Sequence, residues 1–396
     1  MKKLRVCLFI LSVLAISLSC SQEDNVKYYR HLRLYKIHDL AFSYPIDAED
    51  HKKITCYAVR LDENGRIVDV VYLRKGKPAF DRYNEISTIS IEYSKNSEKR
   101  YYRDVDGKSI YKNVDYKLFN FDDARKLLSR TNYAKNGSIV EDTSGIARYS
   151  YATDKLNNVV KSIGLNINGD TTMDSSGLYE VRYKYDSSNN IREIGNYGKD
   201  GRLLSDKYGV AIGRYKHDEN NNRTELIFFD SSDDRIIDMQ FKASKLNYEY
   251  DLNGNLTRVE SLDEHDNLLL NDSLGFASYE IKYNEKGDPV EISSFDEKGD
   301  TTIIVRFDEL GVIIERVFYV RLAHMEQFNH EKYHYYIEKY DKTGNYVEYS
   351  FHNTDGSFYE ISLGYASMQQ EFDNNGNIIE TRFYDADGKL ISKSPR

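Results

Sequence analysis

The sequence has little proline, and it lacks the long stretches rich in alanine, leucine and glutamate that are typical of helices. Only 4 of its 396 residues are proline, whereas 35 are tyrosine, a residue that is enriched in strands. Hydrophobic residues make up 40% of the chain, which provides enough apolar surface to offset the entropy of ordering the backbone. The composition therefore predicts a folded, strand-rich protein.

Concentrated positive charge is also missing. The net charge is -9 and is spread along the chain, whereas binding to a nucleic-acid backbone requires a basic face. Nucleic acid is therefore excluded as a partner. The three cysteines, Cys7, Cys20 and Cys56, cannot form a disulfide framework, and we expect Cys56 to be a small buried residue.

The common motifs of phosphate, nucleotide and acyl-transfer chemistry do not occur in this sequence. It contains no P-loop, no dinucleotide-binding glycine fingerprint, no G-x-S-x-G elbow and no Cys-x-x-Cys pair. We therefore expect no cofactor.

The first residues have the pattern of an export signal. Lys2, Lys3 and Arg5 precede an uncharged run, residues 6–19, that is too short to span a bilayer comfortably. The run ends in Ser-Leu-Ser before Cys20, which resembles a bacterial lipobox, although leucine stands two positions before the cysteine instead of three. We predict a signal peptide over residues 1–19 and lipidation of Cys20; ordinary signal cleavage nearby is the alternative.

Residues 21–24, Ser-Gln-Glu-Asp, form a short polar and acidic stretch after Cys20. This stretch resembles the tether that sends some lipoproteins to the outer face of the outer membrane, and a plain solvated spacer is the alternative. The resulting expectation is an exported outer-membrane lipoprotein, exposed at the cell surface and held by its N-terminal lipid. Residues 20–54 are assigned to the tether and entry segment.

A repeated turn pattern dominates the remaining sequence. An aromatic residue, Asp, two variable residues, Gly or Asn, and then Asn occur at 185–190, 250–255, 340–345 and 372–377. A second turn follows 12 positions after the first, and a Gly-x-Ala element follows eight positions later. The unit repeats every 32 or 33 residues, except where three glycines follow one another at intervals of 12. The predicted turn positions are Asn189, Gly201, Gly254, Gly287, Gly299, Gly344, Gly356, Gly376 and Gly388.

These turns predict β-hairpins. Asp at the first turn position can accept a hydrogen bond from the backbone two residues on, and Gly or Asn supplies the positive φ of a tight turn. Before the turn, side chains alternate in polarity, as in residues 179–185, which places tyrosine and valine on one face of a strand. One unit cannot bury such a face alone, so neighbouring units must stack. We predict an all-β array of antiparallel strand-turn-strand units of about 32 residues over 55–396, either a spiral or an open extended sheet.

The Tyr-Asp-x-x-Gly-Asn turns resemble the YD repeats of the RHS family, which form β-strand spirals. The resemblance covers most of the chain after the leader, but the gaps here alternate between 12 and 20 residues, whereas RHS proteins keep a roughly constant period. The chain is also far shorter than a toxin-enclosing shell, and no toxin module follows Gly388. The resemblance implies repeated antiparallel architecture and does not imply toxin delivery.

One short stretch matches a catalytic motif. His330, Glu331 and His334 satisfy H-E-x-x-H, which binds Zn²⁺ in peptidases when the two histidines lie one helical turn apart. Here residues 332–334 instead take the repeat position of residues 364–366, and the residues that follow are strand-like. We therefore predict a β-repeat corner and no metal site at this position.

These observations favour a non-catalytic protein. The leading hypothesis is a surface lipoprotein whose array is an interaction, adhesion or scaffold surface for a protein or glycan ligand. A zinc-dependent hydrolase using residues 330–334, with Glu348 or Glu360 as a third ligand, is the alternative from another class. A periplasm-facing envelope scaffold is the third hypothesis.

The lipidation hypothesis predicts the chemical form of the mature N-terminus. Mass spectrometry of the protein purified from its membrane fraction should find Cys20 as the first residue, carrying acyl chains. An unmodified N-terminal peptide that starts at another residue would rule out this anchor.

Overall fold

The prediction of an all-β array is confirmed. The structure, a computed structural model, describes residues 25–33, 40–81, 84–271, 276–308, 311–319, 333–342, 344–373 and 377–395. Within these ranges, 26 strands form one open antiparallel sheet, accompanied by the short 3-10 helix η2 (Asp50–Lys52). Among the described residues, no helix has the length and apolar character needed to cross a bilayer.

The strands are six to eight residues long, apart from the two-residue strand β5. The first half of the sheet contains β1 (Val26–Arg33), β2 (Ala41–Ile46), β3 (Thr55–Leu61), β4 (Ile67–Arg74), β5 (Lys77–Pro78), β6 (Thr88–Tyr93), β7 (Ser97–Arg103), β8 (Tyr116–Phe121), β9 (Leu127–Tyr133), β10 (Arg148–Thr153), β11 (Val159–Leu165), β12 (Glu180–Tyr185) and β13 (Ile191–Tyr197). The second half contains β14 (Ile212–His217), β15 (Arg223–Phe229), β16 (Lys245–Tyr250), β17 (Leu256–Leu262), β18 (Ser278–Tyr283), β19 (Pro289–Phe295), β20 (Thr301–Phe307), β21 (Ile313–Tyr319), β22 (Tyr335–Tyr340), β23 (Tyr346–His352), β24 (Ser367–Phe372), β25 (Ile378–Tyr384) and β26 (Leu390–Pro395).

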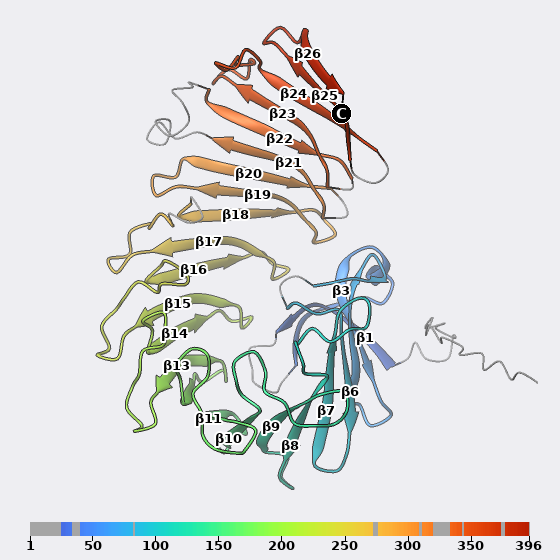
Figure 1. The fold of residues 1–396 in the computed structure, drawn as a ribbon. Coiled ribbons are helices and arrows are strands. Elements are labelled where there is room, and N and C mark those ends of the chain that lie inside the picture. Colours follow the sequence, from blue (N-terminus) through green and yellow to red (C-terminus); the bar gives the residue numbers. More distant parts are fainter. Residues whose placement is uncertain are drawn as a thin grey trace, which may run out of the picture.

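The strands follow one another in chain order through most of the sheet. From β6 to β26, each strand pairs with the next. At the N-terminal end the order changes, because β1 lies between β2 and β3. Residues 20–54, assigned from the sequence to the entry segment, thus contribute two strands to the sheet. The sheet curves strongly, so that its yellow and orange part bends back toward β1 and β3 (Figure 1).

Each first turn is built on one side chain. In the turn after β16, the Asp251 carboxylate oxygen Oδ1 accepts hydrogen bonds from the backbone N–H groups of Asn253 and Asn255, both at 2.9 Å. Gly254, with a φ of 73°, donates its own N–H to the carbonyl of Asp251. A residue at this position must accept a positive φ, which suits Gly and Asn.

The structure places the expected turn residues at this fourth position of the turn. Residues with positive φ include Asn189, Gly201, Gly254, Gly287, Gly299, Gly344, Gly356 and Gly388. Gly376 lies outside the described residues. Arg125, at the fourth position of the turn 122–126, also has a positive φ, of 61°.

The tyrosine before the turn links one unit to the unit before it. The Tyr250 hydroxyl donates a hydrogen bond to the backbone carbonyl of Arg223, 27 residues earlier, at 3.0 Å. Tyr93, Tyr185 and Tyr283 make the equivalent bond to the residue that follows the previous first turn, each at 2.8 Å. The aromatic-Asp pair of the repeat therefore has two separate tasks, since the Asp closes its own turn and the Tyr joins its unit to a neighbour.

The Gly-x-Ala element marks a third turn, which the sequence pattern did not identify as such. Asp206 Oδ1 accepts hydrogen bonds from the N–H groups of Tyr208 and Val210, at 2.8 and 3.0 Å. Gly209 has a φ of 92°, and the following alanine, Ala211, is fully buried. The Ala211 N–H donates to Phe229 on β15, and its carbonyl accepts from Asn196 on β13. Because the alanine lies inside the ladder, the next strand starts at a fixed register.

The irregular interval in the repeat also has a structural explanation. β19, β20 and β21 are joined by two successive hairpin turns, 296–300 and 308–312, with no corner between them. The unit that lacks about 20 residues therefore lacks the corner and still supplies strands to the same sheet.

The tyrosine link predicts the effect of removing a single hydroxyl. Tyr250→Phe keeps the ring but leaves the partly buried Arg223 carbonyl without this donor, so the free energy of unfolding should fall by about 0.5–1.5 kcal/mol. Urea unfolding followed by circular dichroism measures the change. Tyr116→Phe is the control, because that ring stacks on Tyr133 with centroids 4.9 Å apart. An equal loss in both variants would contradict the role of the Tyr250 hydroxyl.

Candidate interaction surface

The two faces of the sheet differ in chemistry. One face carries the apolar core, in which Leu226, Phe228, Leu246 and Val259 are buried together. The other face carries charged side chains, arranged so that a glutamate lies between bases from neighbouring strands. Glu193 contacts Lys184 at 2.6 Å and Arg214 at 3.1 Å; the same arrangement surrounds Glu225 and Glu291. We call this the charged face.

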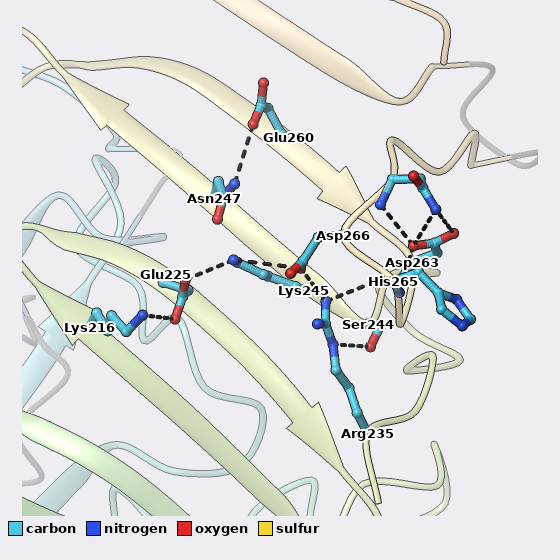
Figure 2. A network of polar contacts seen from close by, with 11 residues as sticks. Lys216, Glu225, Arg235, Ser244, Lys245, Asn247, Glu260, Asp263, His265 and Asp266 are labelled. Carbon is cyan, nitrogen blue, oxygen red and sulfur yellow. Dashed lines mark hydrogen bonds and ion pairs between the residues drawn. The ribbon is translucent and has the colours of Figure 1, made fainter.

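Figure 2 shows one part of the charged face. Glu225 lies between Lys216 and Lys245, each at 2.9 Å, and Lys245 continues to Asp266 at 3.6 Å. Arg235 joins the same Asp266 at 2.8 Å and also donates to the Ser244 hydroxyl and to the Asp263 carbonyl. The network therefore links three strands, β14, β15 and β16, to the turn at residues 263–267.

These contacts determine the charge of the glutamates. Burial opposes ionisation of Glu225, but hydrogen bonds from Lys216 and Lys245 outweigh burial and lower the pKa of its carboxyl group. Glu193 shows the same balance, and its pKa is also lowered. A carboxyl group that acts as a general acid at neutral pH needs a raised pKa, so these glutamates are suited to structural pairing.

An aromatic patch interrupts the charged face at β21–β23. The Tyr335 ring stacks on His352 with centroids 4.9 Å apart, and His352 stacks on Phe358 at 5.0 Å. Tyr319 lies beside Tyr335 at 5.5 Å. Phe358 is 40% exposed, and Tyr335 takes the repeat position that Glu180 and Lys245 hold in earlier units. We call Tyr319, Tyr335, His352 and Phe358 the aromatic patch.

His352 holds the patch in place. Its Nδ1 donates to the carbonyl of Gly356 at 3.2 Å, and its Nε2 accepts from the Ser350 hydroxyl at 2.9 Å. Burial lowers the pKa of the imidazole, which favours the neutral ring. A neutral ring suits both the stacking and the two hydrogen bonds.

A shallow recess of about 490 Å³ lies on the edge of the sheet between the turns 62–66 and 122–126. Its lining includes Arg66, Tyr93, Lys95 and Arg125. Arg66 pairs with Asp62 at 2.7 Å, and Arg125 pairs with Glu98. The guanidinium charges of the recess are thus balanced within the chain.

The H-E-x-x-H stretch is only partly described. His330 and Glu331 lie outside the described residues. His334 donates its backbone N–H to the carbonyl of His352 at 2.7 Å, as Ala366 does one unit later to Tyr384 at 2.8 Å. This is the repeat position expected from the sequence.

Glu348 and Glu360 are the residues that the hydrolase alternative would use as a third zinc ligand. Glu348 pairs with Lys339 at 2.7 Å, and Glu360 is exposed. In the part of the chain that the structure describes, no three His, Cys, Asp or Glu side chains gather closely enough to hold a metal ion.

Of the three cysteines in the chain, the structure describes Cys56. Cys20, the predicted lipidation site, lies outside the described residues, as does the whole leader. Cys56 on β3 is fully buried beside Ile54 and Leu73. Burial raises the pKa of its thiol to about 11, so the group stays protonated and unreactive.

Comparison with known proteins identifies no relative. No family model and no curated protein matches the chain. The crystal structure of TcdB2-TccC3-Cdc42 is 13% identical with a TM-score of 0.29, and 87% of this chain aligns with 17% of that one. The crystal structure of TcdB2-TccC3 is also 13% identical with a TM-score of 0.27, covering 86% of this chain and 18% of that one. A porin-like protein from Bacteroides uniformis is 11% identical with a TM-score of 0.24, covering 75% and 90% of the two chains.

These similarities are too weak to carry a conclusion about function. The chain spans less than a fifth of the TcdB2-TccC3 chains. The β-repeat architecture rests on the strand pairing of this chain itself.

The lowered pKa of His352 predicts a dependence of stability on pH. The imidazole is neutral in both states above its ordinary value of 6.5. Below that value the unfolded chain takes up the proton more readily, so stability falls with decreasing pH, by at most about 1.4 kcal/mol per pH unit for one proton. His352→Phe should remove this contribution, because other units carry Tyr197 or Phe229 at the position.

The measurement is urea unfolding between pH 5 and 7.5. Tyr335→Phe is the matched control, since it keeps both the stack and His352 and should retain the wild-type slope. Identical slopes for wild type and His352→Phe would show that His352 does not titrate differently on folding.

Proposed function

We propose that this chain is an exported, surface-anchored lipoprotein whose β-repeat array is a non-catalytic interaction surface for a protein or glycan ligand. The observation that carries the proposal is the aromatic patch, in which the exposed Phe358 and the half-buried Tyr335 stack on the buried His352. Rings of this kind supply contact area with little conformational entropy to lose, and they are enriched where proteins bind their ligands.

The leader supports the anchoring part of the proposal. If Cys20 carries the lipid, five residues separate it from β1, which begins at Val26. Five extended residues span at most about 18 Å, so the sheet begins close to the membrane. The acidic residues after Cys20 favour the outer face of the outer membrane, and the periplasmic face is the alternative.

The use of the acidic side chains supports the non-catalytic part. The turn carboxylates, such as that of Asp251, already accept two backbone hydrogen bonds. On the charged face, Glu193 and Glu225 lie between two bases each. Side chains with these partners are engaged in holding the fold. The same turns support our placing the chain near the YD-repeat proteins of the RHS family.

Substitution within the aromatic patch tests the proposal. The lipid-free chain, immobilised by its N-terminus, is probed against purified surface glycans and host extracellular proteins. We expect Tyr335→Ser to lower the affinity for the ligand that the wild type retains by about tenfold or more, which is in the range of a binding hot spot. Met173→Ser is the control, because Met173 is 50% exposed but lies in a distant unit.

Equal binding by wild type and Tyr335→Ser, or an equal loss in Met173→Ser, would contradict the patch as the contact site. Stoichiometric zinc in the purified protein, with peptidase activity that Glu331→Ala abolishes, would replace the proposal by the hydrolase alternative. Resistance to added protease on intact cells, with digestion only after the outer membrane is opened, would favour a periplasm-facing scaffold.

A further inference from the structure

The N-terminal strands also contact turns that lie far along the chain. Besides pairing with each other, β1, β2 and β3 contact the first turns at 218–222, 251–255 and 284–288. Figure 1 shows the consequence, since the blue strands lie beside the turn ends of the yellow and orange strands. About 180 to 230 residues separate the partners.

Tyr44 makes the central contact. Its hydroxyl accepts a hydrogen bond from the Asn222 side chain at 3.1 Å, and its ring lies against Gly254 so closely that a Cβ there would overlap the ring. His31 lies edge-on to the same ring at 5.5 Å and bonds the carbonyl of Asn253 at 3.0 Å. The glycine of the turn thus provides the space that the tyrosine occupies.

Two arginines lie close to glycines of the next turns along the same edge of the sheet. A Cβ at Gly287 would overlap the Arg30 guanidinium, and a Cβ at Gly311 would lie 2.9 Å from the Arg74 guanidinium. Between them, the Thr55 hydroxyl donates to Asp288 at 2.5 Å. Asp288 is only 3% exposed, and it stands where the turns at 186–190, 218–222 and 251–255 carry Asn. Four turns along this edge, 218–222, 251–255, 284–288 and 308–312, therefore receive side chains from β1, β2, β3 and β4.

The backbone of Tyr44 is itself strained. Its φ is 58°, in the left-handed region that bulky residues rarely adopt unless their surroundings hold them there. Pro45 follows, and its fixed φ restricts the same segment. The strained residue is therefore the one whose ring lies against Gly254.

We propose that the first-turn edge of the array is a binding site for tyrosine and arginine side chains, and that the β1–β2 hairpin occupies it as a latch that closes the curved sheet. The contact is small and largely polar, whereas each strand pair of the sheet is held by a ladder of backbone bonds. A contact of this kind opens at lower free energy than the sheet unfolds. The latch is independent of the proposed ligand-binding function; with Cys20 lipidated, it would hold the anchored end against the middle of the array.

A pair of glycine substitutions isolates the latch. Gly254→Ala and Gly299→Ala both place a side chain at positive φ, at 73° and 86°, so both strain the turn similarly. Only Gly254 faces Tyr44, since a Cβ at Gly299 would meet nothing within 4 Å. We expect amide hydrogen exchange in residues 41–46 to accelerate about tenfold in Gly254→Ala, with a larger radius of gyration in solution scattering and unchanged exchange in β22–β25. Gly299→Ala should leave both properties at the wild-type values.

A second variant separates opening from misfolding of the turn. Tyr44→Ala empties the space with the Gly254 turn intact, and it should accelerate exchange in residues 41–46 to the same extent. In the double variant the two effects should not add, because both remove one contact. Equal behaviour of Gly254→Ala and Gly299→Ala, wild-type exchange in Tyr44→Ala, or additive effects in the double variant would each overturn the latch.

Discussion

A hydrogen-bonded turn residue is the interaction on which the rest of this molecule depends. In most of the first turns, one Asp or Asn side chain accepts backbone N–H groups, as Asp218 does from Asn220 and Asn222 at 2.9 and 2.7 Å. That closure leaves the fourth residue at positive φ and sends the chain back along its neighbour. Because the same device recurs in the second turn and at the corner, the chain builds a long sheet from local interactions.

The turns alone would produce separate hairpins, and the tyrosine before the Asp joins them. Its hydroxyl reaches the carbonyl that follows the previous first turn, as in Tyr185 and Val159. The units that carry Tyr93, Tyr185, Tyr250 and Tyr283 therefore depend on a neighbour for a hydrogen bond as well as for apolar contact. The corner alanines, such as Ala277, are fully buried and lie within the ladder, since the Ala277 N–H donates to the carbonyl of Phe295. Register and curvature thus follow from small, repeated contacts.

The side chains of the charged face also contact one another across neighbouring strands. Glutamates and bases on the charged face pair across strands, which satisfies the carboxylates and lowers their pKa values, as for Glu291. Against this background, the departures from the repeat are informative. Tyr335 stands where Glu180 and Lys245 stand in two other units and stacks on His352, and Tyr44 enters a space that a glycine turn leaves open. We locate the interaction surface and the latch at these two departures.

The sequence by itself determined the fold class and the positions of the turns. A turn of this kind is encoded within about six residues, so Asp, Gly and Asn at 251, 254 and 255 were sufficient to predict it. The Gly-x-Ala element was visible as a repeat, but its meaning as a third turn required the hydrogen bonds of Asp206. Only the tertiary structure decided that β1 and β2 join the sheet, that Tyr44 meets Gly254, and that Tyr335, His352 and Phe358 form one stack. The contacts of the N-terminal strands join positions up to about 230 residues apart, so they depend on how the curved sheet brings distant units together, which no local pattern encodes. The stack of Tyr335 on His352 lies within one hairpin, and it follows from the register that pairs these two residues.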